Sequence, residues 1–551
     1  MQQRKQELIG KIAVKAFEQP LDHHDLWFQG DIRDNYYYAS YLYAASMNDG
    51  LTIHFNREDA RLKAELVLQR VLELQNRDQA SPTYGHWPLH LRPTPKEAPF
   101  NSLPVELMGS LMVYFYHHYR ESMSLPLRDS FKNALFHIYK SDFYRKPLEH
   151  YHHHEAKYTA AKLIFGQLYQ DKELLEDGFQ SLRLTLERIT KIGMSEYGGL
   201  PWFWHWVQAF TCAWELAEDI EIRAALERML DYLWSVRAAY YLRGAWVGAH
   251  SRGWPHDIPQ DRNLLLDYVQ FGDFSLPDDM PRTEYAGFLT YEAPVQAKSE
   301  ALNRSVPAEL KIRVPRPAAI AENDEDDLHS YVYFTENFAV GGMWERALEF
   351  DNEQHRWDVT VPLGAVDGVN RLFFFHPGPG YSKGDLRHQS EYAEVLFHKQ
   401  TVAAFYGIPD GEPEEIIGCL PNGEWIEEPN ALFGYCGGVF IAVYIQCPYQ
   451  REVLADRSVV TSSGSMNTVV VECVDLAGAS HHGVSNLQQF AEKMRCKQPH
   501  FNSSYENSCK LIYKTLQEES LAIMIDEQGE ISKFVNGSTV DFKAYAYHSY
   551  T

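Results

Sequence analysis

The spacing of apolar residues divides the chain into two parts. Between about residues 59 and 241, apolar side chains recur at helical spacing, which is typical of amphipathic helices. The segments that fit this period are 60–75, 104–119, 155–170, 177–193, 203–219 and 222–241. Gly, Pro or polar residues separate them, and no short repeat of the solenoid kind is present. This pattern predicts helical hairpins that curve into an incomplete (α/α) toroid.

Beyond Tyr331 the apolar period shifts to two. The segments in this half are short, rich in Val, Tyr and Phe, and separated by Gly, Pro and Asn, as antiparallel strands are. They span 331–340, 356–363, 371–376, 392–399, 401–407, 438–446, 467–475, 520–526 and 530–535, and a short helix is expected at 486–494. Because most of these strands have no helix between them, we expect an antiparallel β-sandwich.

Residues 303–330 separate the two patterns. This segment holds three prolines and an acidic run, which is the composition of a linker. We therefore predict a multidomain α+β chain, with an (α/α) incomplete toroid over residues 1–302, a linker over 303–330 and an antiparallel β-sandwich over 331–551. The length of 551 residues agrees with this division, because it exceeds the size of one ordinary core.

Charge and cysteine content narrow the class of partner. The net charge of −24 disfavours nucleic acid and anionic membrane surfaces, since the long-range field repels polyanions. The N-terminal residues lack the apolar core of a signal peptide, and no segment approaches the roughly 18–20 apolar residues of a membrane span. The seven cysteines are scattered and lack CxxC spacing. These features predict a cytoplasmic protein, and they leave a homo-oligomer open.

The strongest chemical signal lies between residues 195 and 254. Tryptophans, which can stack on sugar faces, occur there close to His250 and Arg252. An Arg beside a His can hold and polarise a carboxylate. Arg237, Arg243 and Arg252 also lie in a segment without acidic residues, where the negative field of the protein could be reversed locally, and Arg262 and Arg282 follow it. The combination predicts a cleft that processes acidic sugars, although a helix C-terminal cluster is an alternative for Arg237 and Arg243.

Several loops carry a family resemblance. They are GHWP (85–88), PFNSLPVE (99–106), SEYGGLPW (195–202), GAHSR (248–252) and the segment 338–359. In this order they resemble the heparinase II/III-like and alginate-lyase-like group of polysaccharide lyases. That resemblance implies a toroid joined to a β-sandwich, with sugar bound in the groove between them. The sequence departs from the family at 198–200, and the lyase Asn–His–Tyr set is absent at its family spacing.

Elimination from a uronate assigns roles to residues of these loops. The carboxylate must be neutralised, a base must take the C5 proton, and an acid must protonate the leaving oxygen. We expect Arg252 to neutralise the carboxylate, His250 to act as base or second neutraliser, and Tyr197 to supply a phenol beside Glu196. Structural alternatives stay open: His250 could brace its loop, Tyr197 could pack in the core, and Glu196 could be a helix N-terminal charge or a salt bridge that positions a ring.

Substrate contacts and metals are expected from further side chains. The candidate substrate-binding residues are Trp87, Asn101, His153, His154, Trp202, Trp204, Trp206 and Trp246. We expect no cofactor. A zinc ion held by the histidine run at 150–154, or a structural zinc held by His376, Asp358 and His388, is a minor alternative, because neither set has a convincing ligand spacing.

Two other functions compete with the lyase. A glycoside hydrolase would need two carboxyl groups facing one bond, and Glu196 with Glu155, Asp257 or Glu284 could supply them. A non-catalytic carbohydrate-binding protein is the third possibility. The predicted function is therefore cleavage of uronate-containing oligosaccharides, with an acidic oligosaccharide as partner and these two alternatives open.

Overall fold

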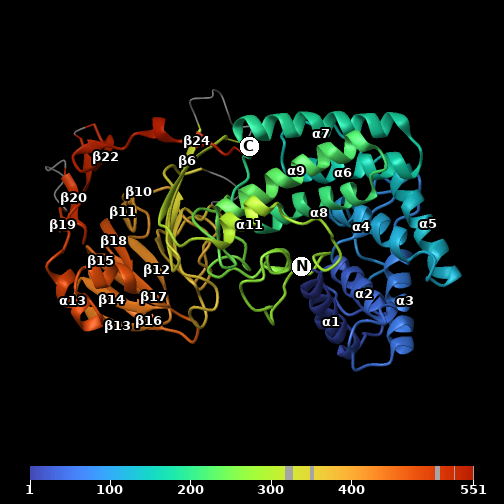
Figure 1. Cartoon of the computed structure of the whole chain (residues 1–551), viewed down its shortest axis with the longest axis horizontal. Helices are drawn as coiled ribbons and strands as arrows, with labels where there is room; N and C mark the ends of the chain where they lie inside the picture. The colour runs from blue at the N-terminus through green and yellow to red at the C-terminus, as the bar shows by residue number, and fades with distance from the viewer. Residues whose placement is uncertain (317–326, 348–352, 503–508, 527, 550–551) are drawn as a thin grey trace.

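A computed structural model of the chain describes residues 1–316, 327–347, 353–502, 509–526 and 528–549. Helices occupy the N-terminal part and antiparallel sheets the C-terminal part, and Figure 1 shows the two parts side by side along the longest axis. The predicted fold class is therefore confirmed in its order of a helical region followed by antiparallel sheets.

The helical part is built from pairs of neighbouring helices. Its helices are α1 (Gln2–Glu18), α2 (Ile32–Met47), α3 (Arg57–Glu73), α4 (Leu103–Tyr119), α5 (Leu125–Lys140), α6 (His153–Leu168), α7 (Lys172–Ile192), α8 (Leu200–Leu216), α9 (Ile220–Ala239), α10 (Leu265–Gln270) and α11 (Val295–Leu302). Helix α2 packs on α3, α6 on α7, and α8 on α9, while α4 contacts α6 and α8. No described helix is long and apolar enough to cross a membrane.

Local sequence explains where these helices begin. The side chains of Asn56, Asp171 and Asp219 accept hydrogen bonds from the first free N–H groups of α3, α7 and α9. Helices α2 and α5 were not predicted. Helix α2 is buried around most of its circumference, so it lacks the polar face that reveals a helical period. Helix α5 does have a helical spacing of buried apolar residues, from Leu127 to Ile138.

The sheets form one core. A nine-stranded sheet has the order β16-β17-β12-β9-β8-β7-β6-β5-β24, and a six-stranded sheet has the order β10-β11-β18-β15-β14-β13. Side chains of both sheets share a hydrophobic cluster, which includes Phe373 and Ile441. The strands of the two sheets are β5 (Ala308–Val314), β6 (Leu328–Phe334), β7 (Ala339–Met343), β8 (Trp357–Thr360), β9 (Arg371–Phe375), β10 (Ala393–His398), β11 (Thr401–Gly407), β12 (Glu415–Pro421), β13 (Glu424–Glu428), β14 (Ala431–Cys436), β15 (Val439–Ile445), β16 (Tyr449–Val453), β17 (Arg457–Ser463), β18 (Met466–Asp475) and β24 (Ala546–Tyr547).

The other strands and short helices lie outside these two sheets. A five-stranded sheet comprises β19 (His500–Phe501), β20 (Cys509–Lys514), β21 (Ser520–Ile525), β22 (Ile531–Val535) and β23 (Ser538–Thr539). Two short ribbons in the helical part pair β1 (Trp87–Pro88) with β2 (Phe100–Asn101) and β3 (Tyr241–Leu242) with β4 (Ala245–Trp246). Helices α12 (Leu476–His481) and α13 (Leu487–Arg495) follow β18, and η3 (Phe542–Ala544) precedes β24. Helix α13 agrees with the helix expected at 486–494.

The sheet part begins earlier than the linker prediction allows. Strand β5 lies inside the segment 303–330 and pairs antiparallel with β6 over its whole length. This corrects the linker assignment for 308–314, where alternating Leu310, Ile312 and Val314 give the period of a strand. Residues 317–326 of the expected linker lie outside the described residues.

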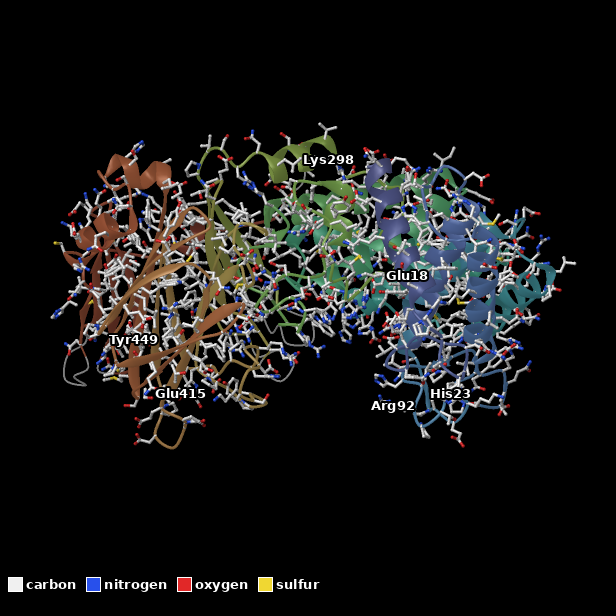
Figure 2. All side chains as sticks on the ribbon, turned by 90° about the horizontal axis from the view of Figure 1, so that it is seen from below. Glu18, His23, Arg92, Lys298, Glu415 and Tyr449 are labelled. Atoms are coloured by element: carbon white, nitrogen blue, oxygen red, sulfur yellow. The ribbon has the colours of Figure 1, made fainter. Side chains whose placement is uncertain are left out.

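Both parts meet in a buried junction. Val332, Phe334 and Ala339 of β6 and β7 belong to the same hydrophobic cluster as the helices. Backbone hydrogen bonds join His250 to His355 in both directions, at 2.9 and 3.0 Å. Figure 2 shows that His23 and Arg92 of the helical part project on the same side of the molecule as Glu415 of the sheet part.

Candidate functional site

A group of polar side chains gathers where α4 and α6 begin. Glu106 lies in the first turn of α4, and His153, His154, Lys157 and Tyr158 lie in the first turns of α6. We call these five residues the helix-end cluster. Because α4 packs on α6, side chains 48 and 52 residues apart in sequence come into hydrogen-bonding distance.

Glu106 is the centre of this cluster. Its buried carboxylate accepts hydrogen bonds from Lys157 Nζ, from Tyr158 Oη at 2.8 Å, and from His154 Nδ1 at 2.7 Å. Burial raises the pKa of Glu106, but the charges and hydrogen bonds of Lys157 and His154 outweigh it and hold this pKa well below its ordinary value. The carboxylate is therefore ionised at neutral pH and can only accept hydrogen bonds.

That ionised carboxylate fixes the tautomer of His154. Since Glu106 cannot donate, the proton of a neutral His154 ring lies on Nδ1, and the lone pair lies on Nε2. Nε2 has no hydrogen-bond partner among the described residues, and the His154 side chain is 33% exposed. An oriented imidazole with an accessible lone pair is suited to general-base chemistry.

His153 and Glu196 form a second, buried contact beside it. Glu196 accepts hydrogen bonds from the His153 backbone N–H at 2.9 Å, from His153 Nδ1, and from Trp206 Nε1 at 3.0 Å. The His153 ring stacks on Trp202 with centroids 4.8 Å apart. Burial lowers the pKa of His153 and raises that of Glu196. Glu196 and His153 thus position the first turn of α6 and brace the start of α8.

Further basic groups adjoin His153. The rings of His205 and His153 lie 5.9 Å apart, and Arg282 Nη2 donates to His205 Nε2 at 3.1 Å and to Glu284 Oε1 at 2.7 Å. Burial and the nearby Lys157 lower the pKa of His205 to about 3, so the ring is neutral. Arg282 is 21% exposed, and its Nη1 group has no partner in the described part of the chain.

Arg252 lies at the junction with the sheets, 5.8 Å from the ring centre of Trp202, which stacks on His153. Its guanidinium forms an ion pair with Glu353 and lies 4.4 Å from the ring centre of Trp254. Trp254 contacts Trp202 edge to face, with centroids 6.2 Å apart. Arg252 is 29% exposed, so it keeps the predicted access to a ligand, although its charge is partly compensated.

His250 is not at the surface. It is fully buried, its Nδ1 contacts the Gly198 carbonyl, and its Nε2 has no hydrogen-bond partner in the described residues. Burial and the nearby Arg371 lower its pKa well below the ordinary value. This corrects the prediction of His250 as base, because a substrate cannot reach it and the ring braces its loop instead.

His250 belongs to a junction network with His355, Asp358, Arg371 and Asp261. Arg371 donates to Asp261 at 2.6 Å and pairs with Asp358, while His355 Nε2 bonds to Asp358 Oδ2 at 3.0 Å. The side chains of Asp261, His355, Asp358 and Arg371 have no exposed surface. The network joins the loop after β4 to strands β8 and β9 and has a structural role.

Tyr197 also departs from its predicted place. It is buried in a small hydrophobic cluster with Ala249 and Met343, and its hydroxyl accepts a hydrogen bond from Gln354 at 2.6 Å. A phenol held this way is a core residue, which was the structural alternative.

The predicted sugar-stacking indoles are also core residues. Trp87, Trp202, Trp204, Trp206 and Trp246 are each less than 5% exposed. Trp87 donates to the Val71 carbonyl at 2.8 Å, Trp204 donates to that of Asn263 at 2.7 Å, and Trp246 stacks on Tyr240. Their faces are covered by protein, which corrects their assignment as substrate platforms.

Other candidates have local partners. Asn101 accepts the Leu103 N–H at 2.8 Å and so caps α4. Arg237 is buried against Asp267, and Arg243 pairs with Glu336. The expected reversal of the negative field is therefore reduced to Arg252 and Arg282.

The second carboxylates proposed for a hydrolase have local partners. Glu155 accepts backbone N–H groups of residues 149–151, and Glu284 is held by Arg282 and Gln208. Arg282 and His205 lower the pKa of Glu284 well below its ordinary value against the effect of burial. Within the described ranges, no three His, Cys, Asp or Glu side chains are grouped to hold a metal.

Sequence reasoning missed Glu106 and His205 as parts of this site. Glu106 carried a usable signal, since it is a charged residue inside an otherwise apolar helix. His205 carried none, because only the packing of α8 against the loop before Tyr285 brings it next to Arg282.

Comparisons with known proteins give structural matches only. No family model and no curated protein matches the chain. Similar solved structures include a chondroitinase AC lyase (7% identity, 99% of this chain, 98% of that chain, TM-score 0.45) and heparinase III (11%, 92%, 81%, 0.40). A chondroitin AC lyase of Streptomyces coelicolor A3 also matches (10%, 97%, 88%, 0.40). Matches at these scores carry no argument about the reaction or the substrate.

Proposed function

We propose that this protein is a carbohydrate lyase that cleaves uronate-containing oligosaccharides by β-elimination, with His154 as the base. The observation that carries the proposal is the pairing of the partly exposed His154 ring with the ionised Glu106. This pair supplies an oriented lone pair on a partly exposed ring, as a general base requires.

The proposed mechanism begins with the substrate carboxylate. The Nη1 donors of Arg282, which have no partner in the described part of the chain, act with the Arg252 guanidinium to bind and partly neutralise this carboxylate, which makes the C5 proton more acidic. His154 Nε2 takes that proton, and Glu106 stabilises the resulting imidazolium. The C4–O bond breaks as the C4–C5 double bond forms.

The protonated His154 can then return its proton to the leaving oxygen. Tyr197, the phenol expected for this step, is buried and bonded to Gln354. A single imidazole acting first as base and then as acid restores the starting state without a second proton donor.

A glycoside hydrolase is less well supported. That reaction needs a protonated carboxylic acid, whereas Glu106 is kept ionised by Lys157 and His154, and Glu284 by Arg282 and His205. Glu196 and Asp257 have raised pKa values, but Glu196 is enclosed by His153 and Trp206, and Asp257 is fully buried and bonded to Asn263.

We also propose a reducing, cytoplasmic site of action, which would make imported oligosaccharides the substrate. Cys212, Cys419, Cys436, Cys447, Cys473 and Cys496 are all free thiols, which is the state favoured in such a compartment.

The reaction is tested by incubating the protein with a panel of uronate oligosaccharides. β-Elimination should raise the ultraviolet absorbance of a 4,5-unsaturated uronate, and the products should together have the mass of the substrate. Hydrolysis would instead add the mass of water, with oxygen from labelled water in the product. Cleavage with that label and no absorbance rise contradicts the lyase, and binding without cleavage contradicts both enzymes.

A further inference from the structure

A cavity opens between two loops of the sheet part. Its volume is about 570 Å³, within the range of about 300–1,000 Å³ that is typical of small-molecule sites. One wall belongs to the segment 377–392, between β9 and β10, and the other is formed by Glu412 and Pro413 before β12. The partly exposed rings of Tyr381 and Tyr392 line it, so we call it the tyrosine cavity.

The buried His376 joins the two walls of the tyrosine cavity. Its Nε2 donates to the Pro413 carbonyl at 2.7 Å, and its ring lies against that of Tyr392, with centroids 5.5 Å apart. Burial lowers the pKa of His376, so the ring is neutral and adds no positive charge. The Ser390 hydroxyl accepts the Tyr392 N–H at 3.2 Å, which fixes the loop that carries this tyrosine. The protein itself therefore holds the walls in place.

The tyrosine cavity carries negative charge that the protein does not compensate. Glu391 and Glu412 line it, one from each wall, and both are exposed. Neither carboxylate has an ion pair or a hydrogen bond with a described residue, and no Lys, Arg or His is among the described residues that line the cavity. Burial and the charges of these two carboxylates raise the pKa of Tyr392, which places both of them near its ring.

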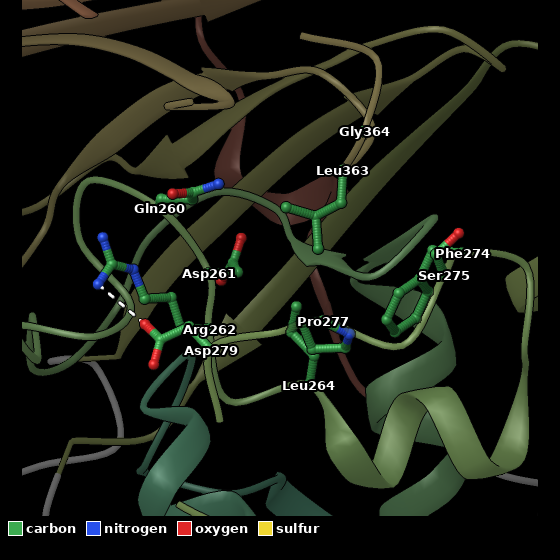
Figure 3. Close-up of a pocket in the computed structure, with 10 residues that line it drawn as sticks. All are labelled: Gln260, Asp261, Arg262, Leu264, Phe274, Ser275, Pro277, Asp279, Leu363 and Gly364. Carbon is green, nitrogen blue, oxygen red and sulfur yellow. Dashed lines mark hydrogen bonds and ion pairs between the residues drawn. The ribbon is translucent and has the colours of Figure 1, made fainter. Parts of the chain in front are cut away.

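A cavity of the same volume at the junction shows the contrast. The segment 260–279 and the loop after β8 line it, and Figure 3 shows its Arg262 paired with Asp279, at 3.2 Å. Its other carboxylate, that of Asp261, is enclosed and paired with Arg371. The junction cavity thus favours no charge in a ligand, whereas the tyrosine cavity favours a positive one.

The lining of the tyrosine cavity also narrows the kind of cation. A metal ion needs several grouped ligands, and within the described ranges no three His, Cys, Asp or Glu side chains are grouped to hold one. A neutral ligand would gain nothing from the charges of the carboxylates. An alkylammonium group would use both features of the lining, because it donates charge-assisted hydrogen bonds to carboxylates and is attracted to the faces of tyrosine rings.

We propose that the tyrosine cavity binds an organic ammonium cation, and that a linear diamine or polyamine fits it best. The carboxylates of Glu391 and Glu412 give a partner to each end of such a molecule, and the two tyrosine rings and three prolines of the lining cover the alkyl chain between the ends. The tyrosine cavity shares no residue with the helix-end cluster. The proposal is therefore independent of the lyase reaction.

The test measures binding to the full chain by calorimetry, with putrescine and spermidine as probes. The comparison ligands are 1,4-butanediol, which replaces the two ammonium groups of putrescine by hydroxyls, and glucosamine, which carries one ammonium group on a sugar. Spermidine should bind more tightly than glucosamine, and the diol should not bind. The Kd of spermidine should rise when NaCl is raised from about 20 mM to about 200 mM, because salt screens exposed charges.

Two double variants separate charge from aromatic contact. Glu391→Gln combined with Glu412→Gln removes both charges and should raise the Kd of spermidine about fivefold or more. Tyr381→Leu combined with Tyr392→Leu keeps an apolar lining without ring faces and should raise this Kd about threefold or more. Circular dichroism checks that both variants fold.

Matched controls lie elsewhere on the sheets. Glu424→Gln combined with Glu452→Gln changes the net charge by the same amount at two exposed positions, and Tyr435→Leu removes another partly exposed ring. Both controls should bind spermidine nearly as the wild type does, since salt screens distant charges.

Four results would overturn the proposal. Putrescine and spermidine could both fail to bind. The diol or glucosamine could bind as tightly as spermidine. The double glutamine variant of the cavity could bind as the wild type does. The two double glutamine variants could lose affinity equally, which would mean that spermidine responds to the overall charge of the protein and not to this cavity.

Discussion

The junction network and the helix-end cluster are built from the same types of residue and differ in what surrounds them. Each contains histidine and a carboxylate in contact with a basic side chain. In the junction network every side chain is enclosed by the helical part and the sheets, whereas in the helix-end cluster the His154 ring reaches solvent. A buried ion pair that cannot meet a ligand positions the two parts, and a supported imidazole at the surface is available for chemistry.

The two regions also differ in the hydrogen-bond partners of their histidine rings. Nδ1 is held in both His250 and His154, by a carbonyl oxygen in the first and by an ionised carboxylate in the second. A carbonyl fixes the ring but adds no charge, while Glu106 stabilises the imidazolium that forms when Nε2 takes a proton. The second arrangement can therefore serve as a base and the first cannot.

The largest effect is expected from Arg371→Met in the junction network. It leaves the buried carboxylates of Asp261 and Asp358 without their cation, and the free energy of unfolding should fall by about 3–5 kcal/mol. Urea denaturation measures this. Arg243→Met is the matched control, since its pair with Glu336 is exposed and should contribute no more than about 1 kcal/mol. Equal stability of both variants would remove the structural role assigned to the network.

His154→Gln should affect turnover and spare stability. Loss of the base should lower kcat about 10²–10⁴-fold, with little change in the urea midpoint because the side chain is partly exposed. His250→Asn is its counterpart, which keeps a donor near the Gly198 carbonyl and should lower stability more than kcat. If His250→Asn abolishes turnover in a folded protein while His154→Gln does not, the assignment of the two regions is reversed.

Asp257→Asn examines a further buried acid, which follows the His250 loop. Burial and the nearby Asp261 raise the pKa of Asp257 to about 8, so the native state holds a proton that the unfolded state releases above about pH 4. Its stabilising contribution is complete below that pH and is lost as the pH rises to about 8, at up to about 1.4 kcal/mol per pH unit.

The variant cannot ionise at this position. As the pH rises from about 5 to about 8, the urea midpoint of the wild type should therefore fall relative to that of the variant. Parallel pH profiles for the two proteins would show that Asp257 does not hold a proton in the native state.

The smallest effect is expected from Tyr158→Phe in the helix-end cluster. It removes one of the hydrogen bonds to Glu106, so stability should fall by about 0.5–1.5 kcal/mol, and kcat should change by less than about tenfold. Tyr139→Phe, which removes a bond to Asp171 away from the cluster, controls for loss of a phenol. A change in kcat as large as that of His154→Gln would make Tyr158 part of the reaction.

Much of the fold was predictable from local pattern. The period of 3.6 in segments such as 177–193 and the period of two in segments such as 467–475 depend on neighbouring residues alone. Helix α2 was not predicted, because burial on nearly all sides removes the contrast between apolar and polar faces that reveals a helical period. Strand β5 was not predicted, because prolines near it gave the composition of a linker.

The candidate site was predicted only in part. His154 was expected to contact substrate, but the role of base was assigned to His250, because glycine, arginine and tryptophan lie near it in a loop. The sequence does not show which of the two histidine rings is exposed to solvent, because exposure depends on what packs against each ring.

The amino-acid sequence by itself determined the order of helices and sheets, the charge balance and the supply of aromatic and basic groups, since these follow from nearest neighbours and composition. Only the tertiary structure decided which histidine faces solvent and which carboxylate supports it. Glu106 meets His154 through the packing of α4 on α6, and His250 meets His355 through the junction of two parts about a hundred residues apart. Such long-range contacts set burial, and burial sets which groups can react.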